Sequence, residues 1–205
     1  MRSFNNMKPL DIGNSYNQIT HIWENEKFDK TNGIIQHKKA INFAKNRGKA
    51  LDIGCGCTGR FIDLLIDEGF TPSGIDISTK MIELAKKRHP SIDFYYGDIC
   101  EYELSEKYDF ITAWDSIWHI PLSKQEKVIA KIIDSLNVGG IFIFSFGGTI
   151  DSGEHIDDYM GAEVYYSSLG INGFLKCFLD LGCIIRHLEF DQYPELHTYL
   201  IVEKA

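Results

Sequence analysis

Apolar and polar residues follow two periods along most of the chain. Short apolar runs have the length and composition of buried strands, and the segments between them carry apolar residues every three or four positions, as amphipathic helices do. The predicted strands are residues 50–53, 71–76, 93–96, 109–114 and 141–146. The predicted helices that follow strands are residues 60–68, 78–88, 124–136 and 171–181. Two further runs, 184–190 and 198–202, predict a closing hairpin.

This order predicts an α/β fold. Strands that alternate with helices form a parallel sheet with helices on both faces, so we expect a three-layer, Rossmann-like, doubly wound sheet. It is mostly parallel, and the terminal hairpin adds an antiparallel strand. Residues 1–48 form an N-terminal helical cap region, with helical runs on either side of a break at residues 30–33. The sheet domain then covers residues 49–205, and its long connection 147–170 is a candidate lid.

Composition narrows the class of protein. The 205 residues are 44% hydrophobic, which suffices for one core. A net charge of −8 without a basic cluster weighs against a nucleic-acid partner. No apolar run is long enough to cross a bilayer, so no membrane partner is expected. Five cysteines, an odd number, favour reduced thiols and a cytoplasmic protein.

The first strand ends in a glycine-rich loop. Gly54, Gly56 and Gly59 have the spacing of the dinucleotide-binding fingerprint, with a strand before them and a helix after them. Asp76 ends the next strand, where a carboxylate can accept both hydroxyls of a ribose. A purely structural glycine turn is the alternative. The loop therefore predicts a nucleoside site at the carboxyl end of the sheet.

Two nucleotide cofactors fit this loop. NAD(P) would place its pyrophosphate at the helix N-terminus. Asp52 precedes the first glycine by two positions, and its carboxylate would repel a pyrophosphate but attract an α-ammonium group. S-adenosylmethionine carries an ammonium and a sulfonium and has no phosphate. The charge pattern favours S-adenosylmethionine.

Four ordered segments resemble the class I S-adenosylmethionine-dependent methyltransferases. They are Ala50-Leu51-Asp52-Ile53-Gly54-Cys55-Gly56-Cys57-Thr58-Gly59-Arg60, Gly74-Ile75-Asp76-Ile77-Ser78, Tyr96-Gly97-Asp98-Ile99 and Tyr108-Asp109-Phe110-Ile111-Thr112-Ala113-Trp114. The similarity runs from about Lys49 to the end of the chain. Cys57 departs from the Thr, Ser or Ala that many relatives carry there.

The resemblance implies a role for each matching residue. Gly54, Cys55 and Gly56 would line the methionine part of the cofactor, Asp52 and the Trp114 carbonyl would face its ammonium group, and Arg60 would reach its carboxylate or pair with Asp63. Asp76 would hold the ribose and Ile77 would lie against the adenine, while Asp98 and Ile99 would bind the adenine edge. The cofactor-binding residues expected from this resemblance are Asp52, Gly54, Cys55, Gly56, Gly59, Asp76, Ile77, Asp98, Ile99 and Trp114.

Methyl transfer from a sulfonium needs positioning more than acid–base chemistry, so a missing catalytic dyad is no objection. His119 is the candidate base, and a packed structural histidine is the alternative. Acceptor contacts are expected from Tyr16 and Trp23 in the N-terminal region and from Tyr165 and Tyr166 in the candidate lid. The segment 147–170 is rich in acidic and aromatic residues, which favours an amine-bearing acceptor. A solvated loop would explain the same charges.

The leading hypothesis is a methyltransferase that uses S-adenosylmethionine to methylate a small molecule. An NAD(P)-dependent oxidoreductase, a non-catalytic S-adenosylmethionine-binding protein and a methyltransferase acting on peptides stay open. Cys55 and Cys57 form a lone C-x-C without a second half, and zinc sites need four ligands, so no metal is expected.

Overall fold

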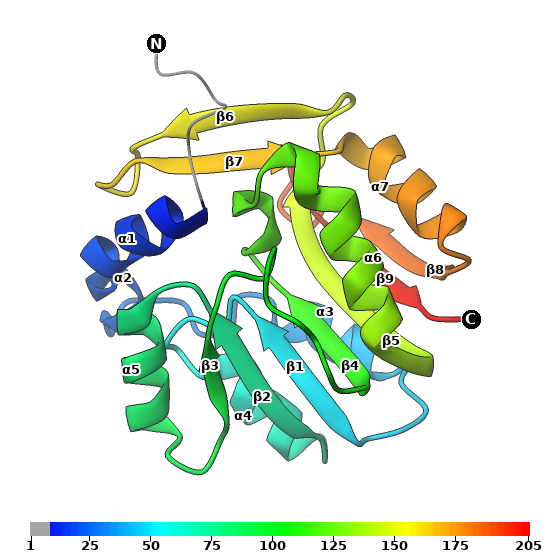
Figure 1. Ribbon diagram of the computed structural model, residues 1–205, viewed down its shortest axis with the longest axis horizontal. Helices are drawn as coiled ribbons and strands as arrows, with labels where there is room; N and C mark the ends of the chain where they lie inside the picture. The colour runs from blue at the N-terminus through cyan, green and yellow to red at the C-terminus, as the bar shows by residue number, and fades with distance from the viewer. Residues whose placement is uncertain (1–8) are drawn as a thin grey trace.

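The computed structural model describes residues 9–205, and the first eight residues of the predicted cap region lie outside the described residues. Its main sheet has seven strands in the order β3-β2-β1-β4-β5-β9-β8 (Figure 1). The strands are β1 (Lys49–Ile53), β2 (Thr71–Asp76), β3 (Phe94–Tyr96), β4 (Tyr108–Ala113), β5 (Leu136–Gly147), β8 (Ile184–Glu189) and β9 (His197–Glu203). The pairs among β1 to β5 are parallel, and β9 runs antiparallel to both of its neighbours. This confirms the predicted fold class.

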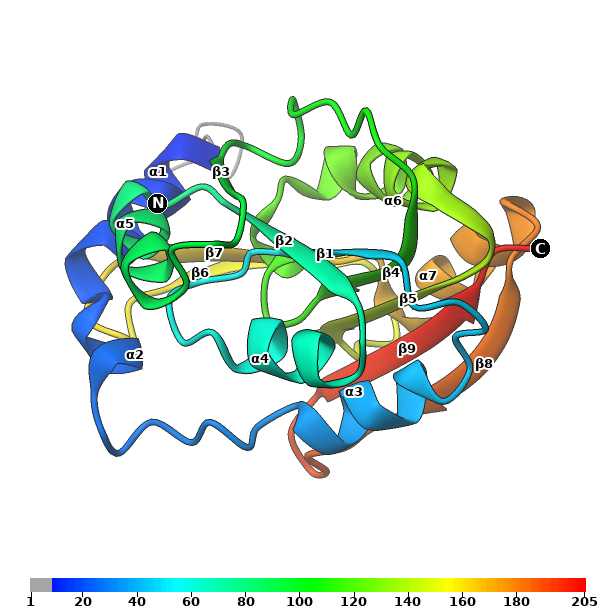
Figure 2. The ribbon, with the colours of Figure 1, turned by 90° about the horizontal axis from the view of Figure 1, so that it is seen from below.

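Helices cover both faces of the sheet. They are α1 (Pro9–Ile19), α2 (His21–Glu24), α3 (Ile34–Ile41), α4 (Arg60–Asp67), α5 (Thr79–Arg88), α6 (Gln125–Ser135) and α7 (Gly170–Asp180). The apolar face of α6 and α7 meets one side of the sheet, where Phe142 and Phe144 are fully buried. On the other side α3 and α4 pack against Ile141 and Ile143 (Figure 2). The central strand β5 is therefore apolar on both faces, as its sequence predicts.

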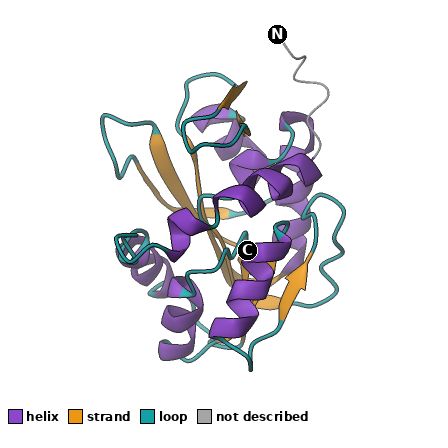
Figure 3. Ribbon diagram, turned by 90° about the vertical axis from the view of Figure 1, so that its left-hand side faces the viewer, coloured by secondary structure: helices purple, strands orange, loops and turns teal. Residues whose placement is uncertain are grey.

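A second, two-stranded sheet lies beyond the carboxyl ends of the main strands. It consists of β6 (Gly153–Asp157) paired antiparallel with β7 (Val164–Ser168). Together with α1 it forms a layer over that edge, as Figures 1 and 3 show. Residues 147–170, expected as a long connection, thus contain an ordered hairpin. This layer closes the edge of the sheet where the glycine loop lies.

Three further details differ from the sequence prediction. The sequence indicates helical character from residue 14 onward, but the first helix begins at Pro9; β5 begins five residues before the predicted strand. The antiparallel strand β9 lies inside the sheet, and the edge strand beyond it is β8. Ser78 caps the N-terminus of α5, since its hydroxyl accepts a hydrogen bond from the Met81 amide at 3.1 Å. Within residues 9–205, no helix has the length and apolar character needed to span a membrane.

Candidate active site

Two adjoining cavities open at the carboxyl ends of β1, β2 and β4. The empty space between their walls, including the part open to solvent, is about 620 Å³ and 990 Å³. Five residues line both of them: Tyr16, Gly54, Asp76, Asp115 and His119. They form one continuous site with a smaller and a larger part, at the switch point where such sheets bind ligands.

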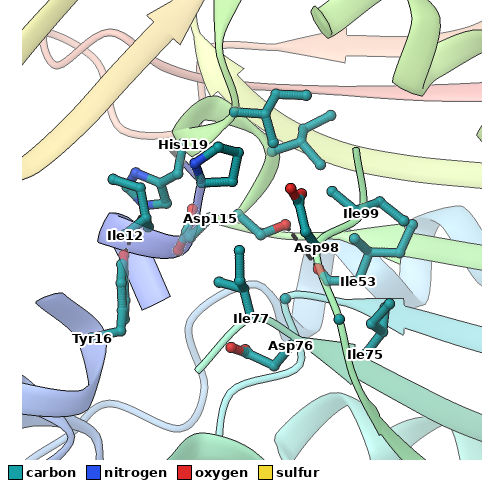
Figure 4. A pocket seen from close by; sticks show the side chains of 16 residues that line it. Ile12, Tyr16, Ile53, Ile75, Asp76, Ile77, Asp98, Ile99, Asp115 and His119 are labelled. Carbon is teal, nitrogen blue, oxygen red and sulfur yellow. Dashed lines mark hydrogen bonds between the residues drawn. The ribbon is translucent and has the colours of Figure 1, made fainter. Parts of the chain in front are cut away.

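The smaller cavity is apolar, with acidic groups at its edge (Figure 4). Its isoleucines are Ile12, Ile53, Ile75, Ile77, Ile99, Ile117 and Ile120. Asp98 lies among them, and its Oδ1 accepts a hydrogen bond from the Cys100 amide at 2.8 Å. A flat apolar ring system with polar edges suits these walls, because the isoleucines exclude water while the carboxylate accepts an amino hydrogen.

Three amides of the glycine loop form hydrogen bonds within the protein, and the Asp76 carboxylate beside the loop lines the cavities. Gly54 has φ of 72°, and a Cβ there would lie 2.2 Å from the Ser116 Cβ, so only glycine fits. The Gly54 and Cys55 amides both donate to the Ile75 carbonyl, at 2.8 and 3.1 Å. The Gly56 amide donates to Asp76 Oδ2 at 2.9 Å. These three amides are therefore not available to a phosphate.

Asp76 is fixed from two sides. Its Oδ1 accepts from the Ser78 amide at 2.7 Å while Oδ2 accepts from Gly56. Burial nevertheless raises the pKa of this carboxyl, and the two backbone hydrogen bonds act in the opposite direction. The carboxylate lines both cavities, at the position where a ribose would join its base to the rest of the cofactor.

The larger cavity is aromatic and contains Arg60, the one lysine or arginine among the described residues that line either cavity. The Arg60 guanidinium lies over the rings of Phe61 and Phe28, at 4.3 and 5.3 Å, and its Nε donates to the Asn32 carbonyl. Asp63 instead contacts His89 at 2.7 Å. The Arg60–Asp63 pair weighed from the sequence is thus absent, because α4 turns Asp63 away from the site.

Two expected cofactor residues lie behind the site. Asp52 is 3% exposed and is not among the residues lining either cavity; burial raises the pKa of its carboxyl to about 7. Gly59, with φ of 72°, leaves the room that His89 and Arg88 occupy. Gly54, Cys55, Gly56, Asp76, Ile77, Asp98, Ile99 and Trp114 do line the cavities. The ammonium contact of Asp52 stays a prediction.

His119 is held by three neighbours. Its Nδ1 lies 2.8 Å from the Tyr165 carbonyl, which requires an N–H donor there. Its Nε2 consequently accepts from the Tyr16 hydroxyl at 2.7 Å and from the Trp118 indole at 2.9 Å. Burial lowers the pKa of His119 to about 4. The geometry is that of a neutral histidine whose lone pair is already used.

A second histidine joins two carboxylates. His197 Nε2 lies 2.9 Å from Asp115 Oδ1, and its Nδ1 lies 2.5 Å from Asp191 Oδ1. Burial opposes protonation of this ring, but both carboxylates raise the pKa of His197 above its ordinary value. Asp115 also exchanges hydrogen bonds with Ser145.

Three of the four acceptor residues expected from the sequence line the larger cavity, and the fourth does not. Tyr16, Trp23 and Tyr166 line the larger cavity. The Tyr165 side chain is 3% exposed in a small apolar cluster, and only its carbonyl supports the site, through His119. The acidic residues Asp151, Glu154, Asp158 and Glu163 do not line either cavity. Asp115 supplies the acidic group there instead.

Sequence reasoning missed Phe28, Met160, Gln192 and the coupling of His197 to Asp115. The positive φ of Asp115, 52°, leaves no mark in the sequence, and Asp191 lies in the turn between β8 and β9. The contact between His197 and Asp115 arises only when β9 pairs with β5. No group of three or more His, Cys, Asp or Glu side chains in residues 9–205 is arranged to hold a metal ion.

Comparison with known proteins finds similarity to methyltransferases over the central part of the chain. Residues 50–140 match the sequence model of the methyltransferase domain family. The matched segment contains the glycine loop, Asp76, Asp98 and Asp115. This part of the chain is therefore similar to methyltransferase domains, and it holds most of the residues that the resemblance to class I S-adenosylmethionine-dependent methyltransferases assigns to the cofactor.

Individual relatives agree with this fold. The carboxy-S-adenosyl-L-methionine synthase of Nautilia profundicola is 35% identical over 124 residues, which are 58% of this chain and 52% of that protein. A crystal structure of a Pyrococcus horikoshii protein superposes with a TM-score of 0.72 at 21% identity, over 88% of this chain and 93% of the other. The S-adenosylmethionine-bound amino pentose methyltransferase of Micromonospora echinaspora gives 0.65 at 14% identity, over 87% and 93%. The matched part of this chain spans about half the length of the curated relatives.

Proposed function

We propose that the protein binds S-adenosylmethionine in the two adjoining cavities and transfers its methyl group to a small molecule. The observation that carries this proposal is the state of the glycine loop. The Gly54, Cys55 and Gly56 amides bond to Ile75 and Asp76, so these three donors are not available to a pyrophosphate, and Asp76 and Asp115 place carboxylates at both cavities. A nucleoside that carries positive charge suits these carboxylates better than a pyrophosphate does.

The lining residues suit each part of the cofactor. The isoleucine-lined cavity with Asp98 would take the adenine, and Asp76 would take the ribose. Arg60 would pair with the methionine carboxylate in the larger cavity. When bound, S-adenosylmethionine supplies an activated methyl group on a sulfonium. The aromatic part of the larger cavity would then place the acceptor next to that group and exclude water.

Isothermal calorimetry tests the cofactor assignment. S-adenosylmethionine and S-adenosylhomocysteine should bind, and NAD⁺ and NADP⁺ should not. Asp76→Ala should weaken binding by about 1–3 kcal/mol, because the ribose loses a charged acceptor. Asp93→Asn is the matched control, since Asp93 is exposed just before β3, the strand paired with β2, and does not line a cavity. Tight NAD(P) binding, or equal affinity in Asp76→Ala, would contradict the proposal.

The similarity to a carboxy-S-adenosyl-L-methionine synthase supports a second candidate, a reaction that modifies the cofactor itself. Mass spectrometry of the nucleoside product separates the two. Methyl transfer releases S-adenosylhomocysteine together with a methylated acceptor. A carboxylated S-adenosylmethionine, formed without any methylated product, would favour the second candidate.

A further inference from the structure

Asp115 presents one oxygen to the site. Its Oδ1 accepts hydrogen bonds from His197 and Ser145, and no hydrogen bond to its Oδ2 is found among residues 9–205. The side chain is 31% exposed and lines both cavities; Figure 4 shows it close to His119. Its φ of 52° is unusual for a non-glycine residue, and such strain concentrates at functional positions.

The cluster around Asp115 carries a net negative charge. His197 has a carboxylate at each nitrogen, so both nitrogens must donate and the ring is cationic. One imidazolium and the two carboxylates Asp115 and Asp191 sum to −1. Gln36 donates to the second oxygen of Asp191 at 2.7 Å, which keeps that side of the cluster in place. Of the two carboxylates, Asp115 is the one that lines the cavities, where Arg60 is the one lysine or arginine among the described lining residues and interacts with Asp115 electrostatically.

Aromatic rings line the larger cavity together with Asp115. Tyr16 lies 5.2 Å from Trp23 between ring centroids, and Tyr166 lies 6.1 Å from Trp118. All four rings line the cavity that Asp115 shares. A carboxylate among aromatic faces is favourable for a group that carries or gains positive charge.

Apart from the carboxylates Asp76, Asp98 and Asp115, the described lining residues offer no free base. His119 uses its lone pair to accept from Tyr16 and Trp118, and His197 is doubly occupied by carboxylates. Burial raises the pKa of Tyr16 and of Tyr166, so neither phenol is a ready base. An alcohol must lose its proton during methyl transfer, whereas a neutral amine needs no base in that step.

We propose that the methyl acceptor is an amine whose N–H donates to Asp115 Oδ2, an inference that rests on the proposed methyltransferase function. The ammonium form loses its proton to solvent before transfer. The amine lone pair then forms the new C–N bond, the C–S bond breaks, and its electron pair returns to sulfur. Nitrogen becomes positive as sulfur becomes neutral, and Asp115 stabilises the charge at its new position.

The test is a matched acceptor library with methyl-labelled S-adenosylmethionine. Each scaffold is supplied as an amine, an alcohol and a carboxylic acid, for example 2-phenylethylamine, 2-phenylethanol and 3-phenylpropionate. Labelled N-methyl products are expected, with kcat/KM rising with pH as the amine is deprotonated. Labelled O-methyl products, or turnover of alcohols or acids without any amine, would overturn the inference.

Binding keeps the inference testable where turnover is slow. The library amines are titrated into the complex with S-adenosylhomocysteine, and at least one should bind more tightly than its alcohol and acid. Asp115→Asn should weaken that binding about 10- to 100-fold, because an amide replaces the charged acceptor. Asp151→Asn, an exposed carboxylate outside both cavities, should leave it unchanged.

The outcomes separate the two proposals. If S-adenosylhomocysteine does not bind the wild-type protein, the proposed function fails. If S-adenosylhomocysteine binds wild type and Asp115→Asn with equal affinity, both proteins are folded. A difference in amine binding then reports on the acceptor contact alone. No amine bound by that folded complex, or an amine bound equally by Asp115→Asn, would then refute the amine inference while leaving the cofactor assignment intact.

Discussion

At the scale of single residues, Arg60 is the one lysine or arginine among the described lining residues that could bind the carboxylate of the proposed cofactor. Its guanidinium is held by the Asn32 carbonyl and by two phenyl rings, so it keeps one position without a carboxylate partner at hydrogen-bond distance among the described residues. A preorganised guanidinium is the residue type that best recognises a carboxylate. A ligand with and without a carboxylate therefore distinguishes carboxylate binding by Arg60 from a role in packing.

We predict that Arg60→Met weakens binding of S-adenosylmethionine about 10- to 100-fold, because the charge-assisted hydrogen bonds to the carboxylate are lost. The decarboxylated analogue should bind wild type and variant within about threefold of each other, since it lacks the group that Arg60 would contact. Calorimetry with both ligands measures the difference. An equal loss for both ligands would assign Arg60 to packing.

His119 gives a prediction about pH and stability. The folded-state pKa is about 4 and the unfolded value is 6.5, so between these values the unfolded chain binds the proton and the folded chain does not. The neutral histidine therefore stabilises the fold fully above pH 6.5, and this stability is lost as the pH falls toward 4.

We predict that His119→Gln is less stable than wild type at pH 7 and that the gap narrows by about 2 kcal/mol at pH 5. His37, with a pKa of about 3, and Asp52, with a pKa of about 7, titrate in both proteins and cancel in the difference. Urea unfolding at the two pH values measures it. A gap that widens at pH 5 would show that His119 is charged in the fold.

At the scale of elements, α1 is part of the cavity wall. Ile12 and Tyr16 line the smaller cavity, and Gly13 lies directly against β2's continuation: a Cβ on Gly13 would lie 2.5 Å from the Ile77 carbonyl oxygen. Asn17 accepts hydrogen bonds from Ser78, Thr79 and Lys80 at the start of α5. The helix is thus fitted to the segment that carries Asp76.

We predict that Gly13→Ala lowers affinity for S-adenosylhomocysteine although alanine favours a helix by up to about 1 kcal/mol. The added methyl must displace α1 from Ile77 and so open the adenine wall. Asn14→Ala is the control, because Asn14 is exposed on the same helix. Calorimetry should show a loss of at least about tenfold in Gly13→Ala and none in Asn14→Ala. Equal affinities would show that α1 adapts at no cost.

The sequence predicted elements well where one period dominates. The strands of the main sheet are apolar and short, and the helices between them keep one apolar face, so both were recognisable. The β6–β7 hairpin was not, because Gly153-Glu154-His155-Ile156-Asp157 has one apolar residue and most of its side chains are exposed. Its order comes from pairing with β7 and from the packing of Val164 and Tyr165 on α1.

At the scale of the whole molecule, the motifs located the site but not its acceptor half. Gly54, Asp76 and Asp98 are close in sequence to strand ends, and the parallel topology brings such ends together. Asp115, His197 and Asp191 come from distant segments that meet only after β9 enters the sheet between β5 and β8. A pairing that depends on this insertion is invisible to local patterns, so the acidic cluster needed the structure.

Because the site joins the sheet edge, α1 and the β6–β7 layer, cofactor binding should stabilise the whole molecule. We predict that S-adenosylhomocysteine at a hundred times its Kd adds about 2.7 kcal/mol to the free energy of unfolding. For a chain of this size that raises Tm by about 5–10 °C, measured by scanning calorimetry. NAD⁺ at the same concentration should leave Tm unchanged, since the Gly54, Cys55 and Gly56 amides are bonded within the protein and Asp115 places a further carboxylate, in addition to that of Asp76, at both cavities. A larger shift with NAD⁺ than with S-adenosylhomocysteine would mean that the loop opens its amides to a dinucleotide, and the charge argument for the cofactor would be wrong.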